Sequence, residues 1–181
     1  MGNVADKEEL HEAAKAGDAE KVEACIEKHA GQNGALDVLD ERYGNTALMW
    51  AVRKGHITIV RGLIKGKASV DMQSECGKSK AGKTALMYAA KQGNLEATQE
   101  LVRAGAALDL QNKQGFTALM LAADVAIAQE ILTAGASLGA LDTEGKTAFE
   151  HAEERNNADV AKFLRGSMVA KKEREDVPKL P

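Results

Sequence analysis

The amino-acid sequence predicts an all-α repeat solenoid, in which helix–turn–helix units stack side by side. In five segments an apolar residue is followed three positions later by an alanine and, further on, by a second apolar stripe. The spacings of three and four residues within the stripes are those of helices with one apolar face. Such a face stays exposed unless a neighbouring unit covers it, so the units are expected to stack. The segments begin at Leu10, Thr46, Thr84, Thr117 and Thr147.

Capping residues set the expected ends of the helices. In the last four segments a threonine precedes the first helix and is expected to cap it, because its hydroxyl accepts a free backbone N–H. In the first three segments a glycine lies between the two stripes, and in the fifth Asn156-Asn157 does; such residues end helices in the left-handed conformation. Residues 167–181 are mixed in charge and contain both prolines, so a frayed extension of the last helix and then a flexible tail are expected there.

Composition argues against several classes of protein. The chain has 181 residues and a net charge of −3, which gives no general attraction to nucleic acid or membranes. No apolar run approaches the roughly 20 residues of a membrane span, and the N-terminus has no secretory signal, so a cytoplasmic location is expected, with the nucleus as the alternative. Cys25 and Cys76 stand alone and no two of the four histidines lie four residues apart on one helix face, so no metal site and no disulfide framework are predicted.

Three stretches carry the repeat pattern most clearly: GNTALMWAVRKGH, GKTALMYAAKQGN and LVRAGAALD. They resemble the ankyrin repeat, whose units read roughly G-x-T-P-L-H-x-A-A-x-x-G-H and later L-L-x-x-G-A. The resemblance covers about residues 6–166 and implies one domain whose repeats are joined by β-hairpin fingers. TALM replaces the T-P-L-H box, and only His11 occupies the family's histidine position, so a more apolar core than the family norm is expected. The five repeats are expected near 6–30, 41–67, 79–105, 112–136 and 142–166.

The repeats are unevenly spaced. Their alanine anchors, at positions 13, 51, 89, 122 and 152, lie 38, 38, 33 and 30 residues apart, against a family period of 33. The first two steps each contain five extra residues, near 31–40 and 72–82, in loops that the resemblance assigns to fingers. The last step lacks three residues between the two helices of the fourth repeat, so a clipped corner is expected there.

One stretch, GKSKAGKT at 77–84, fits the phosphate-binding pattern G-x-x-x-x-G-K-[ST]. The repeat supplies part of this match, because G-x-T precedes the first helix in four repeats. A phosphate-binding loop follows a buried strand, whereas the preceding residues DMQSEC are polar. A nucleotide- or phosphate-binding protein that uses the finger at 76–84 is therefore the alternative function. No catalytic combination of side chains and no cofactor is indicated, so the chain is not expected to be an enzyme.

The resemblance implies a monomeric adaptor, inhibitor or regulatory subunit that binds another protein with its fingers and the concave face of its first helices. Tyr43 and Phe116 are expected to contact the partner, whereas Trp50 and Tyr88 either do so or pack between adjacent first helices. Basic residues predominate among the other positions, so an acidic surface or peptide is the expected partner. Nucleic acid ranks lower, because the sequence pI is about 5.9. The candidate partner-binding residues are Arg42, Tyr43, Trp50, Arg53, Lys54, Lys80, Lys83, Tyr88, Lys91, Lys113, Phe116 and Leu121.

Overall fold

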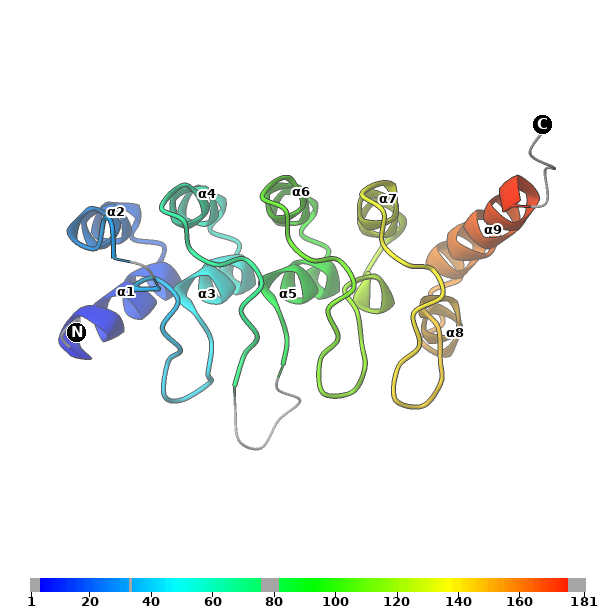
Figure 1. The fold of residues 1–181 in the computed structure, drawn as a ribbon, viewed down its shortest axis with the longest axis horizontal. Helices are drawn as coiled ribbons and strands as arrows, with labels where there is room; N and C mark the ends of the chain where they lie inside the picture. The colour runs from blue at the N-terminus through cyan, green and yellow to red at the C-terminus, as the bar shows by residue number, and fades with distance from the viewer. Residues whose placement is uncertain (1–3, 33, 76–81, 176–181) are drawn as a thin grey trace.

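The computed structural model describes residues 4–32, 34–75 and 82–175, and these residues form a row of stacked helical units in two layers (Figure 1). We call the side on which the first helices and the fingers lie the inner face. The layer of first helices contains α1 (Val4–Ala16), α3 (Ala47–Lys54), α5 (Ala85–Gln92) and α8 (Ala148–Glu154). The layer of second helices contains α2 (Ala19–Lys28), α4 (Ile57–Lys65), α6 (Leu95–Arg103), α7 (Val125–Thr133) and α9 (Ala158–Glu175). This arrangement is the predicted all-α repeat solenoid.

The caps that the sequence predicts are present. The hydroxyl oxygens of Thr46 and Thr84 accept hydrogen bonds from the backbone N–H groups three residues later, at 3.2 and 3.3 Å. Thr147 forms a full capping box with Glu150. Gly55 and Gly93 end α3 and α5 in the left-handed conformation, with φ of 77° and 69°. Capping residues therefore fix where these short helices begin and end, because helix propensity alone is too weak to define the ends of such short helices.

The core runs through all the repeats. Leu48, Leu86 and Leu119, together with the alanine anchors, are buried between the layers. The methionines of the TALM sequences, Met49 and Met87, are also buried, at 1% exposure each. The methionines that replace the family's histidine are thus part of the apolar core.

The fingers before α3, η1 and α8 are tight loops. Two backbone hydrogen bonds close each of them, for example from Asp40 N–H to the Asn45 carbonyl and from Gly44 N–H to the Asp40 carbonyl, both at 2.9 Å. Over the described residues no strand forms, so the expected β-hairpins are not confirmed. Neighbouring fingers are joined by a hydrogen bond from Glu75 N–H to the Gly44 carbonyl, at 2.9 Å. A Cβ on Gly44 would lie 1.9 Å from the Glu75 carbonyl oxygen, and φ is +60°, so this contact requires glycine.

The fourth repeat departs further from the pattern than the sequence indicated. Its first helix is reduced to a single 3₁₀ turn, η1 (Leu119–Leu121), and the chain turns away at Ala122. The sequence predicted only a shorter turn between the two helices of this repeat, whereas the structure shows that the first helix itself is lost. Two carbonyls that a helix would have used, those of Met120 and Ala123, accept hydrogen bonds from the Arg155 guanidinium and from Asn157 Nδ2 of the next repeat. This pairing explains why Arg155-Asn156-Asn157 replaces the usual Gly-His turn there.

The C-terminal helix is the longest. Helix α9 continues past the end of the expected last repeat, near residue 166, to Glu175. None of the helices in the described part of the chain is long and apolar enough to cross a membrane. The prediction of a flexible tail concerns in part residues 176–181, which lie outside the described residues.

Candidate protein-binding surface

Cationic side chains and aromatic rings alternate along the inner face of the first three repeats. Lys15 Nζ lies 4.7 Å from the centre of the Trp50 ring. The Arg53 guanidinium lies 4.3 Å from that ring and 5.1 Å from the ring of Tyr88, and Lys83 Nζ lies 5.5 Å from Tyr88. At these distances a cation is attracted by the ring's quadrupole. We refer to Lys15, Trp50, Arg53, Tyr88 and Lys83 as the cation–ring ladder.

The ladder follows from the repeat. Lys15 and Arg53 each lie two residues after an alanine anchor, and Trp50 and Tyr88 each lie one residue before one. Stacking consecutive repeats therefore brings the cation of one repeat over the ring of the next. In the fourth repeat Leu121 takes the ring's position, so the ladder ends at the third repeat.

Partly buried hydrogen bonds hold the two rings in place. Trp50 donates its indole N–H to Asp40 Oδ2 at 2.6 Å, and the Tyr88 hydroxyl donates to Asn45 Oδ1 at 3.1 Å. Asn45 is itself 1% exposed. Because each ring is fixed at its polar end, the ladder is formed before any partner arrives. Preorganisation of this kind lowers the entropic cost of binding.

The carboxylate of Asp40 is the central acceptor of this arrangement. Desolvation opposes its ionisation, but hydrogen bonds from Tyr43 N–H, the Trp50 indole and Asn45 N–H outweigh this and hold the pKa of Asp40 below its usual value. The nearby Lys15 acts in the same direction. Asp40 is therefore charged at neutral pH, and its charge is already satisfied inside the protein.

Several cations of the inner face are not paired in this way. Arg53, Lys54, Lys91 and Lys113 take part in no ion pair with any described residue, and all but the half-buried Arg53 are exposed. The fifth repeat differs, because its charges neutralise one another: Lys146 binds both Glu144 and Glu154, at 2.9 and 2.6 Å, and Arg165 binds Glu153 at 3.1 Å. The side chains available to a partner on the inner face are thus mainly positive, over the second to fourth repeats.

The other predicted contact residues divide into exposed and buried ones. Tyr43 is 40% exposed and meets the Trp50 ring edge-on, with ring centres 5.3 Å apart. Phe116 is partly buried against His151, at 4.7 Å between ring centres. Trp50 and Leu121 are only 6% and 8% exposed, so we correct their assignment as contact residues: both belong to the core. Burial follows from packing between adjacent repeats, the interpretation that the sequence left open for Trp50.

Sequence reasoning missed the first rung of the ladder, Lys15. A signal was available, since Lys15 holds the same position after its alanine anchor as Arg53 and Lys91. The role of Asp40 as the partner of an indole could not be found in this way, because it depends on the fold of the finger. Arg42 stacks on Tyr43, with its guanidinium 5.2 Å from the ring centre, and Lys80 lies outside the described residues.

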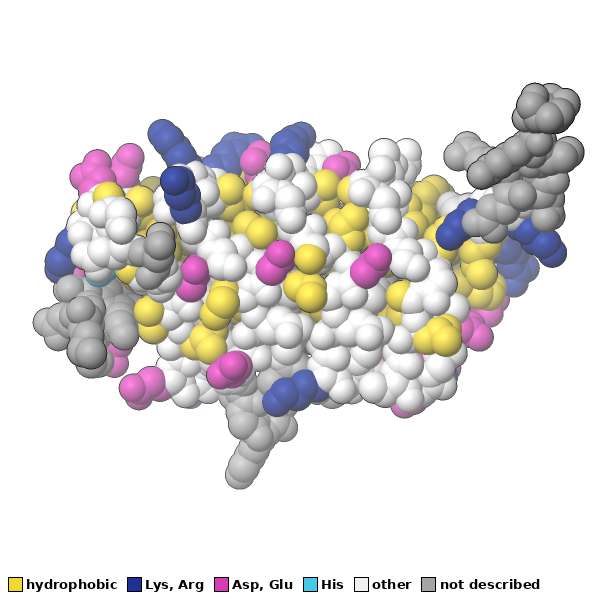
Figure 2. Space-filling view, in the orientation of Figure 1, with side chains coloured by type: hydrophobic (Ala, Val, Ile, Leu, Met, Phe, Trp, Pro, Cys, Tyr) yellow, Lys and Arg dark blue, Asp and Glu magenta, His cyan; other side chains and the backbone are white. Residues whose placement is uncertain are grey.

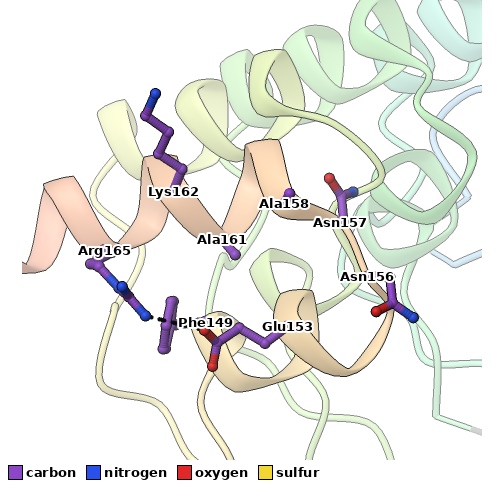
Figure 3. A pocket seen from close by; sticks show the side chains of 8 residues that line it. All are labelled: Phe149, Glu153, Asn156, Asn157, Ala158, Ala161, Lys162 and Arg165. Atoms are coloured by element: carbon purple, nitrogen blue, oxygen red, sulfur yellow. Dashed lines mark hydrogen bonds and ion pairs between the residues drawn. The ribbon is translucent and has the colours of Figure 1, made fainter.

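A hollow lies at the C-terminal end of the stack, between α8 and α9 (Figure 3). There the Arg165 guanidinium covers the Phe149 ring at 4.9 Å and binds Glu153. Glu150 and Glu153 take positions that Met49 and Val52 fill in the second repeat. Two of the three charged residues that line the hollow, Arg165 and Glu153, already pair with each other, and the hollow resembles a polar end cap more than a binding site.

The face toward the viewer in Figure 2 carries no comparable cluster of cations. Lys and Arg side chains lie along its upper edge, over α4 and α6, at α9, and at the lower edge beside the fingers, while its middle is largely uncharged with acidic side chains set singly. On the second helices Arg61 is bound by Glu96 and Glu100, at 2.8 and 3.0 Å. The charge of the second helices is thus partly neutralised.

In the alternative function, a phosphate-binding loop at 76–84, the Thr84 hydroxyl would have to bind Mg²⁺, but it is already engaged within the protein. Only Gly82, Lys83 and Thr84 of GKSKAGKT lie within the described residues. The Thr84 hydroxyl, which would bind Mg²⁺ in such a loop, accepts the N–H of Met87 and belongs to a residue only 2% exposed. Among the described residues no group of His, Cys, Asp and Glu side chains could hold a metal ion. Thr84 therefore acts as a helix cap.

A row of stacked helix pairs with fixed side chains along one face defines a helical-repeat binding protein. The chain matches the family model for ankyrin repeats (3 copies) over residues 3–74 and 67–141, and it belongs to the ankyrin repeat family. It is also similar to osteoclast-stimulating factor 1 from Monopterus albus, with 38% identity over 63 residues. That match covers 35% of this chain and only 27% of the relative. Ankyrin repeats generally serve as protein–protein interaction modules.

Proposed function

We propose that this chain is a protein-interaction module that binds an acidic segment of a partner protein on the inner face of its first three repeats. It would act as an adaptor, an inhibitor or a regulatory subunit, as a monomer in the cytoplasm or nucleus. The observation that carries the proposal is Arg53, a cation held between two fixed rings with no carboxylate partner among the described residues.

The rings support the cation and are not themselves the contact. Trp50 is buried and Tyr88 is half-buried, and each already has cations over its ring. A guanidinium that stacks on a ring keeps its N–H groups free at the edge, where a carboxylate accepts two of them at once. Arg53 therefore presents a directed site for one carboxylate of the partner.

The unpaired lysines add a longer-range attraction. Lys54 and Lys91 lie at the ends of α3 and α5, close to Arg53 along the inner face. Exposed charges of one sign speed the encounter with an oppositely charged partner more than they lengthen the life of the complex. The net charge of −3 makes nucleic acid a poor alternative, since non-specific binding to phosphates needs an excess of positive charge.

Affinity capture from a cell extract with a charge-reversal variant tests this function. The variant is Arg53→Glu with Lys54→Glu, and the control is Lys65→Glu with Lys162→Glu, which changes the net charge equally on second helices. Proteins captured by the wild type and by the control, but not by the inner-face variant, would be the partners. The purified partner is expected to bind more weakly as salt rises. Equal loss of capture by both variants would refute an inner-face site.

A further inference from the structure

A groove continues the cation–ring ladder at its N-terminal end. It lies between α1 and the first finger, the loop of residues 38–45 that precedes α3. It has a volume of about 500 Å³ and shares Lys15 with the ladder. Tyr43, which meets the ring of Trp50, lies on its wall. The groove and the ladder therefore form one continuous surface. The residues that matter for its chemistry are Glu8, Lys15, Val38, Leu39, Glu41 and Tyr43.

The groove is net acidic, whereas the ladder is basic. The carboxylates of Glu8, Glu12, Asp40 and Glu41 line it together with two cations, Lys15 and Arg42, and the Arg42 guanidinium lies over the Tyr43 ring at 5.2 Å. Glu8 and Glu41 are exposed and take part in no ion pair with any described residue. Glu12, by contrast, is bound to Lys15 at 2.6 Å, and Asp40 is satisfied by the hydrogen bonds of the first finger. The carboxylates left for a partner are therefore Glu8 and Glu41, one on each side of the groove.

The floor of the groove is apolar. Val38 and Leu39 are half-buried, and the exposed Tyr43 forms part of the wall. A lysine or arginine suits such a groove, since its aliphatic stem packs on apolar surface while its charged end stays in water beside carboxylates. A carboxylate in the same place would face Glu8 and Glu41 and be repelled.

We propose that the partner segment carries a lysine or arginine next to its acidic residues, and that this basic side chain enters the groove between α1 and the first finger. The inference rests on the proposed function, because it takes the acidic residues to lie over Arg53, Lys54 and Lys91. It adds a charge order: one basic residue at the first repeat and carboxylates at the second and third. That order fixes the direction in which the segment lies along the repeats.

Selection from a random 16-residue peptide library displayed on phage tests this charge order. The library is selected against the wild type, against Glu8→Gln with Glu41→Gln, and against a control, Glu20→Gln with Glu23→Gln, which removes the same charge from exposed positions of α2. On the wild type and the control, enriched peptides should contain Asp and Glu together with a Lys or Arg at a constant offset on one side. On the groove variant the acidic residues should persist and the basic one should disappear.

Binding of the best peptide, measured by fluorescence anisotropy, gives the magnitude. Replacing its basic residue by glutamine should weaken binding to the wild type about fivefold, the upper range for an exposed ion pair, and should have little effect on the groove variant. Acidic peptides without a basic residue, or a basic residue that persists on the groove variant, would overturn the inference and leave the proposed function intact. No acidic enrichment on any form would contradict the proposed function itself.

Discussion

In the fingers before α3 and α8 one side chain accepts backbone N–H groups of the finger and also a hydrogen bond from a side chain of the following first helix. Asp40 does this in the second repeat, and in the fifth Asp142 accepts two backbone N–H groups as well as the His151 ring nitrogen at 2.7 Å. In the fourth repeat Asn112 holds this position, and Leu121 occupies the place in the repeat that Trp50 and His151 take in theirs. The Asn112 Nδ2 atom is buried and has no hydrogen-bond partner among the described residues. The same finger position thus accepts a hydrogen bond from the first helix in the second and fifth repeats. In the fourth repeat this hydrogen bond is missing, because the corresponding residue, Leu121, is apolar.

The first prediction concerns the indole hydrogen bond. Trp50→Phe keeps an aromatic ring but removes the N–H that Asp40 accepts, and a partly buried acceptor without its donor costs about 1–3 kcal/mol of folding free energy. Urea unfolding measures the loss. Tyr43→Phe is the control, since it removes an exposed hydroxyl and should cost less than about 0.5 kcal/mol. Equal costs for both variants would mean that the Trp50 hydrogen bond does not stabilise the fold.

The second prediction concerns pH. The pKa of Asp40 is lower in the folded protein than in the unfolded chain, where it is about 3.9. Its charged form therefore stabilises the fold above about pH 4, and this contribution is lost as pH falls through the folded pKa. The difference in unfolding free energy between the wild type and Asp40→Asn should be largest near pH 7 and shrink below about pH 4. Urea titrations at several pH values measure it, and a difference independent of pH would contradict the assignment.

At the scale of elements, the helices of the regular repeats could be predicted from the sequence. The prediction was wrong in the fourth repeat, where side chains of the fifth repeat bind carbonyl groups that a helix would have used. Threonine caps and left-handed glycines are local signals, so α3 and α5 were predictable from them. The loss of the fourth repeat's first helix was not, because counting missing residues does not tell which backbone groups can be satisfied elsewhere. In the described parts of the fingers no strand forms, for a related reason: side chains such as Asp40 bind the N–H groups that a ladder would use.

The third prediction tests this substitution of contacts. Arg155→Ala leaves the Met120 carbonyl without its donor and should cost about 1–3 kcal/mol. Lys162→Ala, a change of one exposed cation on α9, should cost less than about 0.5 kcal/mol. Hydrogen exchange should show the loss first in α8 and α9, since Arg155 connects them to the fourth repeat. Wild-type stability and exchange in Arg155→Ala would show that the clipped repeat does not depend on its neighbour.

For the binding surface, the sequence identified the exposed cations but not their arrangement. Arg53, Lys54 and Lys91 follow from the repeat register, which places the same positions on the same face in every unit. That Trp50 is a support and not a contact depends on its hydrogen bond across ten residues to Asp40, which no periodicity encodes.

For the molecule as a whole, the distribution of charge matters more than its sum. The chain carries a net charge of −3, yet the inner face of the second to fourth repeats presents unpaired cations. The two are compatible because the excess of acidic side chains lies elsewhere, for example at the exposed Glu20 and Glu23 of α2. A solenoid buries its core between neighbouring repeats and leaves this face open along its length, so a partner can contact several repeats at once.

The central claim is that the partner lies on the inner face of the first three repeats, and site-specific photocrosslinking tests it most directly. A benzophenone-bearing residue in place of Tyr43 is compared with the same residue in place of Thr58, which is exposed on α4 of the same repeat. The captured partner should crosslink from position 43 and not from position 58, and the Arg53→Glu, Lys54→Glu variant should abolish the crosslink. Efficient crosslinking from position 58 with none from position 43 would place the partner on the second helices and contradict the account.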